Sequence, residues 1–98
     1  MTLRYGDRGI VFTVPEISRF YGITIRMFHR DHLPPHLHAQ LGDDEIKIEL
    51  ETLSTQGWFP TAALRRTSEW IELHRTELFN CWKLARDGKA IPRVPPLE

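Results

Sequence analysis

The sequence predicts an α+β domain in which an antiparallel sheet of three to four strands, a meander, is packed on one face by a C-terminal helix or a bent helix pair. Two observations predict this fold. Apolar and polar residues alternate in short segments between residues 22 and 50, and an apolar stripe with a helical period follows between residues 60 and 87. Strand patterns followed by a separate helical pattern are typical of α+β proteins.

Three segments, 22–29, 36–41 and 45–50, alternate apolar and polar residues as half-buried strands do. A Gly-Asp-Asp turn separates the last two, which favours an antiparallel meander. Residues 52–59 are expected to form a loop or a fourth short strand, and residues 15–21 a connector. The side chains expected to face the helices are Ile23, Ile25, Leu37, Ala39, Ile46 and Ile48.

The C-terminal half carries the helical stripe. Pro60 suits a first helical turn, where its missing N–H needs no partner, and Gly88 suits the position after a helix end. One helix over residues 60–87 and two helices broken near His74 both fit the pattern. The single helix would be long for a small domain, which favours a bend. The stripe consists of Leu64, Thr67, Ile71, His74, Leu78, Cys81, Trp82 and Ala85.

One domain over residues 15–98 is expected, because a chain of 98 residues builds a single modest core. Residues 1–14 are expected to be an N-terminal extension that offers an extra strand. Residues 89–98 contain three prolines and are expected to be an extended tail or a frayed terminus. The apolar edge of that tail, available for docking on the body or on a partner, is Ile91, Val94 and Leu97.

Composition and charge exclude several classes of protein. The 13 basic and 13 acidic residues give a formal net charge of +0, which argues against a nucleic-acid footprint over the whole molecule but allows a local basic patch. A single cysteine, Cys81, rules out an internal disulfide, so we expect a cytoplasmic location. No apolar run reaches the roughly 18 residues of a membrane span, and no signal peptide is expected.

The densest group of candidate functional residues is segment 29–38, His-Arg-Asp-His-Leu-Pro-Pro-His-Leu-His. His36 and His38 are two positions apart on a predicted strand, so both imidazoles project from one face. Asp31 and His32 precede the prolines and can fold back over that face. These side chains offer the donors of a zinc or manganese site that keeps a position for water, so the candidate metal ligands are Asp31, His32, His36 and His38.

A metal-free acid–base site is an alternative use of the same histidines. If the strands pair as a meander, Arg26 lies near His36 or His38, and the three together supply the base, the acid and the cation that RNA cleavage requires. The candidate catalytic residues are therefore His36, His38 and Arg26. Because the spacing matches no standard metal-binding pattern, a structural or partner-contact role for the histidines is the third alternative.

Several motifs resemble one family. Over residues 15–97 the chain resembles the small bacterial domain-of-unknown-function 4160 family, and residues 1–14 fall outside the resemblance. The Asp-His-x-Pro-Pro-His-x-His run is its most specific part. The matching stretches are residues 15–20, 31–39, 51–53, 63–64, 69–70, 72–75 and 82–85.

The resemblance implies a bacterial setting and a protein partner. Members are often encoded beside a second small domain, of family 2442, and the pair is suspected to be a toxin–antitoxin module. The leading hypothesis is therefore a toxin-like component that is held by this cognate small protein and acts on RNA. A homodimer is the other expected assembly, and a metal-dependent hydrolase and a non-enzymatic binding module or regulator are the alternative functions.

Overall fold

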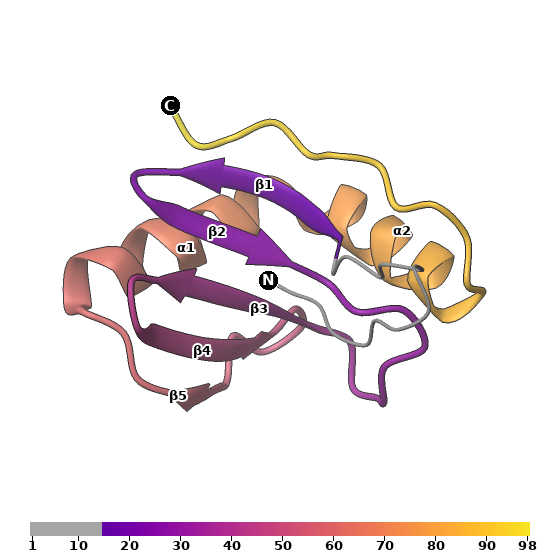
Figure 1. Ribbon diagram of the computed structural model, residues 1–98, viewed down its shortest axis with the longest axis horizontal. Coiled ribbons are helices and arrows are strands. Elements are labelled where there is room, and N and C mark those ends of the chain that lie inside the picture. Colours follow the sequence, from indigo (N-terminus) through magenta and orange to yellow (C-terminus); the bar gives the residue numbers. More distant parts are fainter. Residues whose placement is uncertain (1–14) are drawn as a thin grey trace, which may run out of the picture.

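Within residues 15–98, a five-stranded antiparallel sheet carries two helices on one face (Figure 1). The computed structural model describes residues 15–98. The strands are hydrogen-bonded in chain order, so the sheet is the predicted meander. The elements are β1 (Glu16–Phe20), β2 (Ile23–Arg26), β3 (His36–Leu41), β4 (Asp44–Glu49), β5 (Thr55–Gly57), α1 (Thr61–Leu73) and α2 (Arg75–Arg86).

The prediction of three to four strands was too low, because β1 lies in the segment predicted as a connector. A β-bulge between Glu16 and Ser18 shifts the register there, and both Ile17 and Ser18 are buried. The bulge breaks the alternation that identifies a strand in the sequence. β5 confirms the short-strand alternative for residues 52–59. The extra strand suggested for residues 1–14 lies outside the described residues.

The three alternating segments are neighbouring strands in the predicted orientation. Ala39 of β3 pairs with Ile25 of β2 and with Ile46 of β4, and Leu37 pairs with Ile48. Because paired residues share a face, this register gathers the apolar side chains on the side of the helices. The six predicted core residues are all at most 2% exposed: Ile23, Ile25, Leu37, Ala39, Ile46 and Ile48.

The helical segment consists of two helices that meet at His74, which confirms the broken alternative. Arg75 anchors the junction by donating to the carbonyl oxygens of Leu50 and Glu51, just after β4. Leu64 was predicted in the buried stripe but is only partly buried, because Ala63 takes the inner position. The buried helical residues are Ala63, Thr67, Trp70, Ile71, Leu78, Cys81, Trp82 and Ala85. No helix within residues 15–98 is long and apolar enough to cross a membrane.

The C-terminal tail runs along the body next to β1 (yellow in Figure 1). The backbone N–H of Val94 donates to the carbonyl oxygen of Ile17 at 2.8 Å, and the indole N–H of Trp70 donates to the carbonyl oxygen of Pro95 at 2.8 Å. Val94 is buried, and the other two residues of the predicted apolar edge pack against the core. Docking on the body is therefore the arrangement that the tail adopts.

Candidate metal centre

The loop between β2 and β3 carries Asp31 back over the beginning of β3. The backbone N–H of Arg30 donates to the carbonyl oxygen of Ala85 at 2.9 Å, and Nε2–H of His29 donates to the carbonyl oxygen of Lys89 at 2.9 Å. The loop is thereby fastened to the C-terminal end of α2. Arg30 has a φ of 55°, a left-handed conformation that turns the chain immediately before Asp31.

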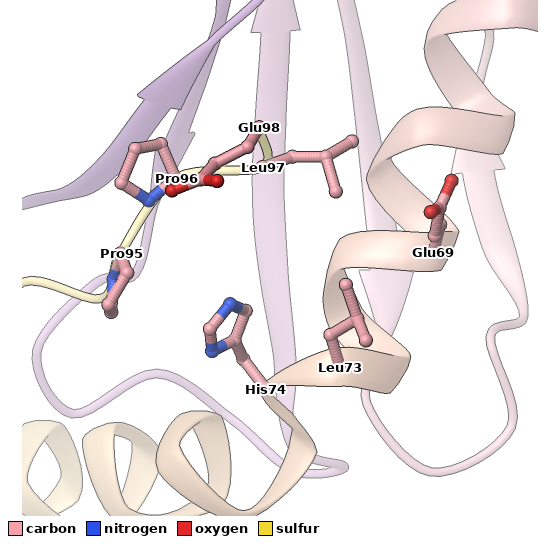
Figure 2. Close-up of a pocket in the computed structure, with 7 residues that line it drawn as sticks. All are labelled: Glu69, Leu73, His74, Pro95, Pro96, Leu97 and Glu98. Carbon is pink, nitrogen blue, oxygen red and sulfur yellow. The ribbon is translucent and has the colours of Figure 1, made fainter.

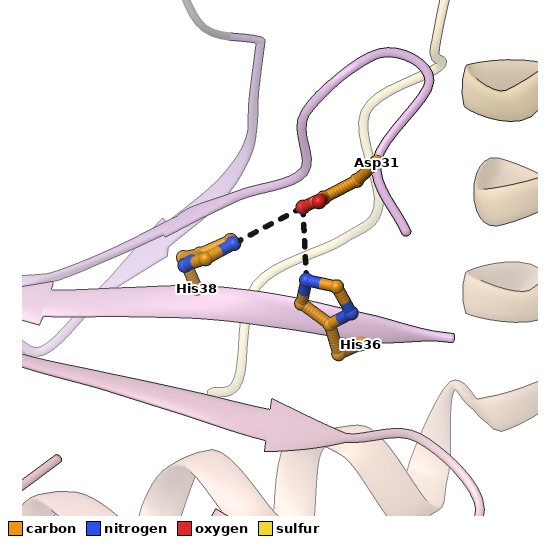
Figure 3. Close-up of side chains that lie close together, drawn as sticks. All are labelled: Asp31, His36 and His38. Carbon is orange, nitrogen blue, oxygen red and sulfur yellow. Dashed lines mark hydrogen bonds and ion pairs between the residues drawn. The ribbon is translucent and has the colours of Figure 1, made fainter. Parts of the chain in front are cut away.

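Asp31, His36 and His38 converge on one point (Figure 3). Oδ2 of Asp31 lies 2.9 Å from Nε2 of His36 and 3.4 Å from Nε2 of His38, and the three potential ligand atoms all lie within 4.8 Å of one another. A tetrahedral zinc ion with bonds of about 2.0–2.1 Å separates its ligand atoms by about 3.3 Å. The two distances from Oδ2 of Asp31 therefore bracket the spacing expected of ligands that share one small divalent ion.

A second set of hydrogen bonds orients His36 and Asp31. Nδ1–H of His36 donates to the carbonyl oxygen of Pro34 at 2.8 Å, so the neutral ring presents the lone pair of Nε2 to the site. Oδ1 of Asp31 accepts the backbone N–H of His32 at 2.8 Å, which leaves Oδ2 for the site. Metal-binding histidines generally donate their other N–H to a carbonyl or carboxylate, and His36 follows this arrangement.

The contact between His36 and Asp31 requires a cation. With Nδ1–H bound to Pro34, neutral His36 has only a lone pair at Nε2, and the carboxylate of Asp31 has only acceptor oxygens. Two acceptors 2.9 Å apart repel each other unless a proton or a metal ion lies between them. Either an imidazolium at His36 or a shared divalent ion therefore satisfies this geometry.

Burial and neighbouring charges set the protonation of the other two groups. Burial lowers the pKa of His38, and the nearby His36 lowers it further against the opposing effect of Asp31. Burial raises the pKa of Asp31, but the N–H of His32 and the two histidines outweigh it, so this pKa is lowered overall. These directions favour a neutral imidazole and an ionised carboxylate, which are the forms that bind metals.

The family of the chain follows from its sequence. The model of a family described as "Domain of unknown function (DUF4160)" matches residues 22–83. The chain belongs to the DUF4160 family. This confirms the resemblance, and the match contains segment 29–38. No curated protein and no solved structure matches the chain.

Aromatic rings enclose the two histidines of this DUF4160 domain. The ring centroid of His36 lies 5.2 Å from that of Trp82 in α2, and the ring of His38 lies 4.3 Å from that of Phe28. On the outer side, Nδ1 of His38 lies 3.9 Å from a carboxylate oxygen of Glu45. The sequence predicted Trp82 only as a core or interface residue, and nothing local relates it to His36, because α2 is distant in the chain.

His32 lies at the rim of the group and not within it. Its side chain is 70% exposed, and its Nε2 lies 3.8 Å from Oδ1 of Asp31, the oxygen that faces away from the two ligand nitrogens. Its Nδ1–H donates to the carbonyl oxygen of Leu33 at 3.3 Å. Of the four metal ligands predicted from the sequence, the fold brings together Asp31, His36 and His38.

Arg26 lies where the meander predicted it, directly across from His38 on the neighbouring strand. Its guanidinium donates to the side-chain oxygen of Gln40 at 2.8 Å. Gln40 lies two residues beyond His38 on the same strand face, so the guanidinium extends along β3. Of the three predicted catalytic residues, the two histidines touch and Arg26 flanks them.

A second hollow, of about 400 Å³, lies between the end of α1 and the tail (Figure 2). Its one imidazole, that of His74, is bound to a carboxylate oxygen of Glu77 at 2.5 Å. This pairing gives His74 a structural role at the junction of α1 and α2. The residues that line the hollow, none of which belongs to the metal centre, are Glu69, Leu73, His74, Pro95, Pro96, Leu97 and Glu98.

Proposed function

We propose that this domain binds a divalent metal ion, zinc or manganese, through Asp31, His36 and His38, and that it is a metal-dependent hydrolase. The observation that carries the proposal is the convergence of two Nε2 atoms on one carboxylate oxygen, at 2.9 and 3.4 Å. The hydrogen bond from His36 to Pro34 supports it, because it directs the lone pair of Nε2 into the site.

The arrangement of the three ligands suits hydrolysis. His36 is 1% exposed, whereas His38 and Asp31 are 19% and 16% exposed, so the group reaches solvent at His38 and Asp31. A divalent ion held by these three ligands would keep one coordination position free for water. Such an ion would activate that water for hydrolysis at neutral pH. Trp82 and Phe28 hold the imidazoles in place from the protein side.

Metal analysis tests this proposal. Protein purified without a histidine tag, and incubated with zinc or manganese, is expected to retain about one ion per chain after desalting. His36→Ala, His38→Ala and Asp31→Asn are each expected to lose the ion while keeping the circular dichroism spectrum of the wild type. His74→Gln is the matched control, because His74 is a partly buried histidine outside the group, and it should retain the metal.

A folded wild type that retains neither zinc nor manganese would overturn the metal centre. In that case a protonated His36 explains its short contact with Asp31. The metal-free acid–base site then replaces the metal-dependent hydrolase as the proposed function. Equal metal retention by the His36→Ala and His74→Gln variants would also overturn it.

For the biological setting we propose a toxin-like component of a two-gene module in the bacterial cytoplasm, acting on RNA and held by a small partner of the family 2442 type. The observation that favours a protein partner is the outer edge of β5, which within residues 15–98 pairs only with β4. Trp58, next to this strand, is 65% exposed. An edge strand offers unpaired N–H and C=O groups to a partner strand, and a tryptophan beside it provides an anchor.

Inducible expression tests the module. Wild-type protein is expected to arrest growth of a bacterial host, co-expression of the neighbouring gene is expected to relieve the arrest, and His36→Ala is expected to be harmless at the same protein level. If His36→Ala arrests growth as strongly as the wild type does, the toxicity does not depend on the histidine site.

A further inference from the structure

Arg26, His38 and Lys47 form a row across three neighbouring strands. His38 of β3 pairs with Arg26 of β2 on one side and with Lys47 of β4 on the other. Paired residues of antiparallel strands project from the same face, with Cβ atoms about 4.5–5.5 Å apart. His38, which contributes one of the proposed ligand nitrogens, therefore has a cationic residue on each side.

Neither cation of this row forms an ion pair within residues 15–98. Arg26 donates to the uncharged amide oxygen of Gln40, and Lys47 forms no ion pair within that range. By contrast, Arg19 at the sheet surface is paired with Glu16 at 2.7 Å. Gln40 thus holds the guanidinium without cancelling its charge, so the row carries two positive charges that flank His38.

We propose that this row binds a phosphate group of the substrate, so that phosphate esters are the substrate class. The inference rests on the hydrolytic metal centre proposed above. Arginine binds phosphate oxygens with two parallel N–H bonds, and lysine binds them as a point charge. A phosphate between Arg26 and Lys47 balances both charges and lies next to His38, which pairs with both residues. An uncharged ester or amide has no group that balances them.

The test uses the full chain loaded with Co²⁺, because the visible spectrum of this ion responds to a ligand entering a free coordination position. Inorganic phosphate is expected to change the spectrum of the wild type in a saturable way. Arg26→Gln and Lys47→Gln are each expected to weaken phosphate binding about tenfold. Arg65→Gln, which changes an exposed arginine on α1, is the matched control and should bind phosphate as the wild type does.

Two further probes complete the experiment. Imidazole, which is uncharged at pH 8, is expected to bind all variants with equal affinity, which shows that the metal centre itself is intact. Uridine 5′-monophosphate and the dinucleotide UpU distinguish a phosphate monoester from a diester. If either one binds the wild type more tightly than inorganic phosphate does, and binds Arg26→Gln and Lys47→Gln more weakly, the result supports the row.

The possible failures are distinguishable. A wild type without a Co²⁺ spectrum overturns the metal centre and the row together. A normal Co²⁺ spectrum with no phosphate binding, or with equal phosphate affinity in Arg26→Gln, Lys47→Gln and Arg65→Gln, overturns the row and leaves the metal centre standing.

Discussion

At the scale of single residues, His36 is the side chain on which the site depends. It is almost fully buried, and both of its ring nitrogens have polar neighbours, the carbonyl oxygen of Pro34 and the carboxylate of Asp31. A buried imidazole is tolerated because these contacts replace its hydration. Its position is therefore determined by hydrogen bonding and by packing against Trp82, so that it is preorganised for an ion.

His36→Ala is expected to lower the free energy of unfolding by about 1–3 kcal/mol, because it removes two buried hydrogen-bond partners. Added zinc is expected to raise the melting temperature of the wild type and not that of the variant, since only the native wild type binds the ion. Urea unfolding measures the first effect and thermal unfolding with and without zinc the second. Equal stabilisation of both proteins by zinc would argue against His36 as a ligand.

At the scale of elements, two kinds of contact hold the sheet, the helices and the tail together. The apolar face of the sheet packs on the buried stripe of α1 and α2, in which Trp70 and Ile71 are fully buried. The tail is held to β1 by the backbone bond of Val94 and by Glu16, which contacts both Arg19 and Arg93. The first kind of contact is apolar, and the second responds to pH.

Ile71→Ala is expected to destabilise the protein by about 2–5 kcal/mol, the usual cost of truncating a large aliphatic side chain in a core. Ile71 is fully buried in α1 and belongs to the main apolar cluster. Leu73→Ala is the matched control, because Leu73 is 64% exposed on the same helix and should change stability little. Denaturant unfolding of both variants gives the comparison, and similar losses would contradict the observed orientation of α1.

Glu16 is expected to make the attachment of the tail sensitive to acid. The hydrogen bond from Arg19 lowers the pKa of Glu16 below its ordinary value of 4.5, with Arg93 adding to the effect and burial opposing it. A lowered folded-state pKa stabilises the protein above the unfolded-state value, and this stabilisation is lost as the pH falls through the folded-state value. Wild type should therefore exceed Glu16→Gln in stability at pH 7, and the difference should decrease as the pH falls below 4.5. Denaturant unfolding at pH 7 and at a series of acidic pH values measures this difference, and a constant difference would disprove the linkage.

At the scale of the whole molecule, the two edges of the sheet differ. The tail covers the edge at β1, and the edge at β5 pairs with no other strand of residues 15–98. Because the apolar edge of the tail already packs on the body, we expect association through β5 and Trp58. We propose that a homodimer and a complex with the family 2442 partner would compete for this one edge.

Sedimentation velocity is expected to show self-association of the isolated protein or a complex of the co-expressed pair. Trp58→Ala is expected to weaken either assembly at least tenfold, because exposed tryptophans commonly carry much of the binding energy of an interface. Tyr21→Ala, at an exposed aromatic residue 54% accessible beyond β1, is the control. A monomer with no affinity for the neighbouring protein at micromolar concentration would remove the support for the module.

The sequence by itself determined the elements that have a regular period. Alternation in residues 22–29, 36–41 and 45–50 identified β2, β3 and β4 with their buried faces, because a strand with one buried face repeats every second residue. The same reasoning placed Arg26 near His36 or His38, of which the structure pairs it with His38, and it put His36 and His38 on one face. β1 was not predicted, because its bulge at Ile17 interrupts the alternation of apolar and polar residues.

Only the tertiary structure decided which polar residues of segment 29–38 meet. Asp31 and His32 are adjacent, and the sequence gives both an equal chance of reaching the histidines of β3. The carboxylate of Asp31 points inward and His32 outward because Arg30 is bonded to the end of α2, which sets the path of the loop. That bond, like the packing of Trp82 on His36, joins segments about fifty residues apart, and local sequence patterns carry no information about such contacts.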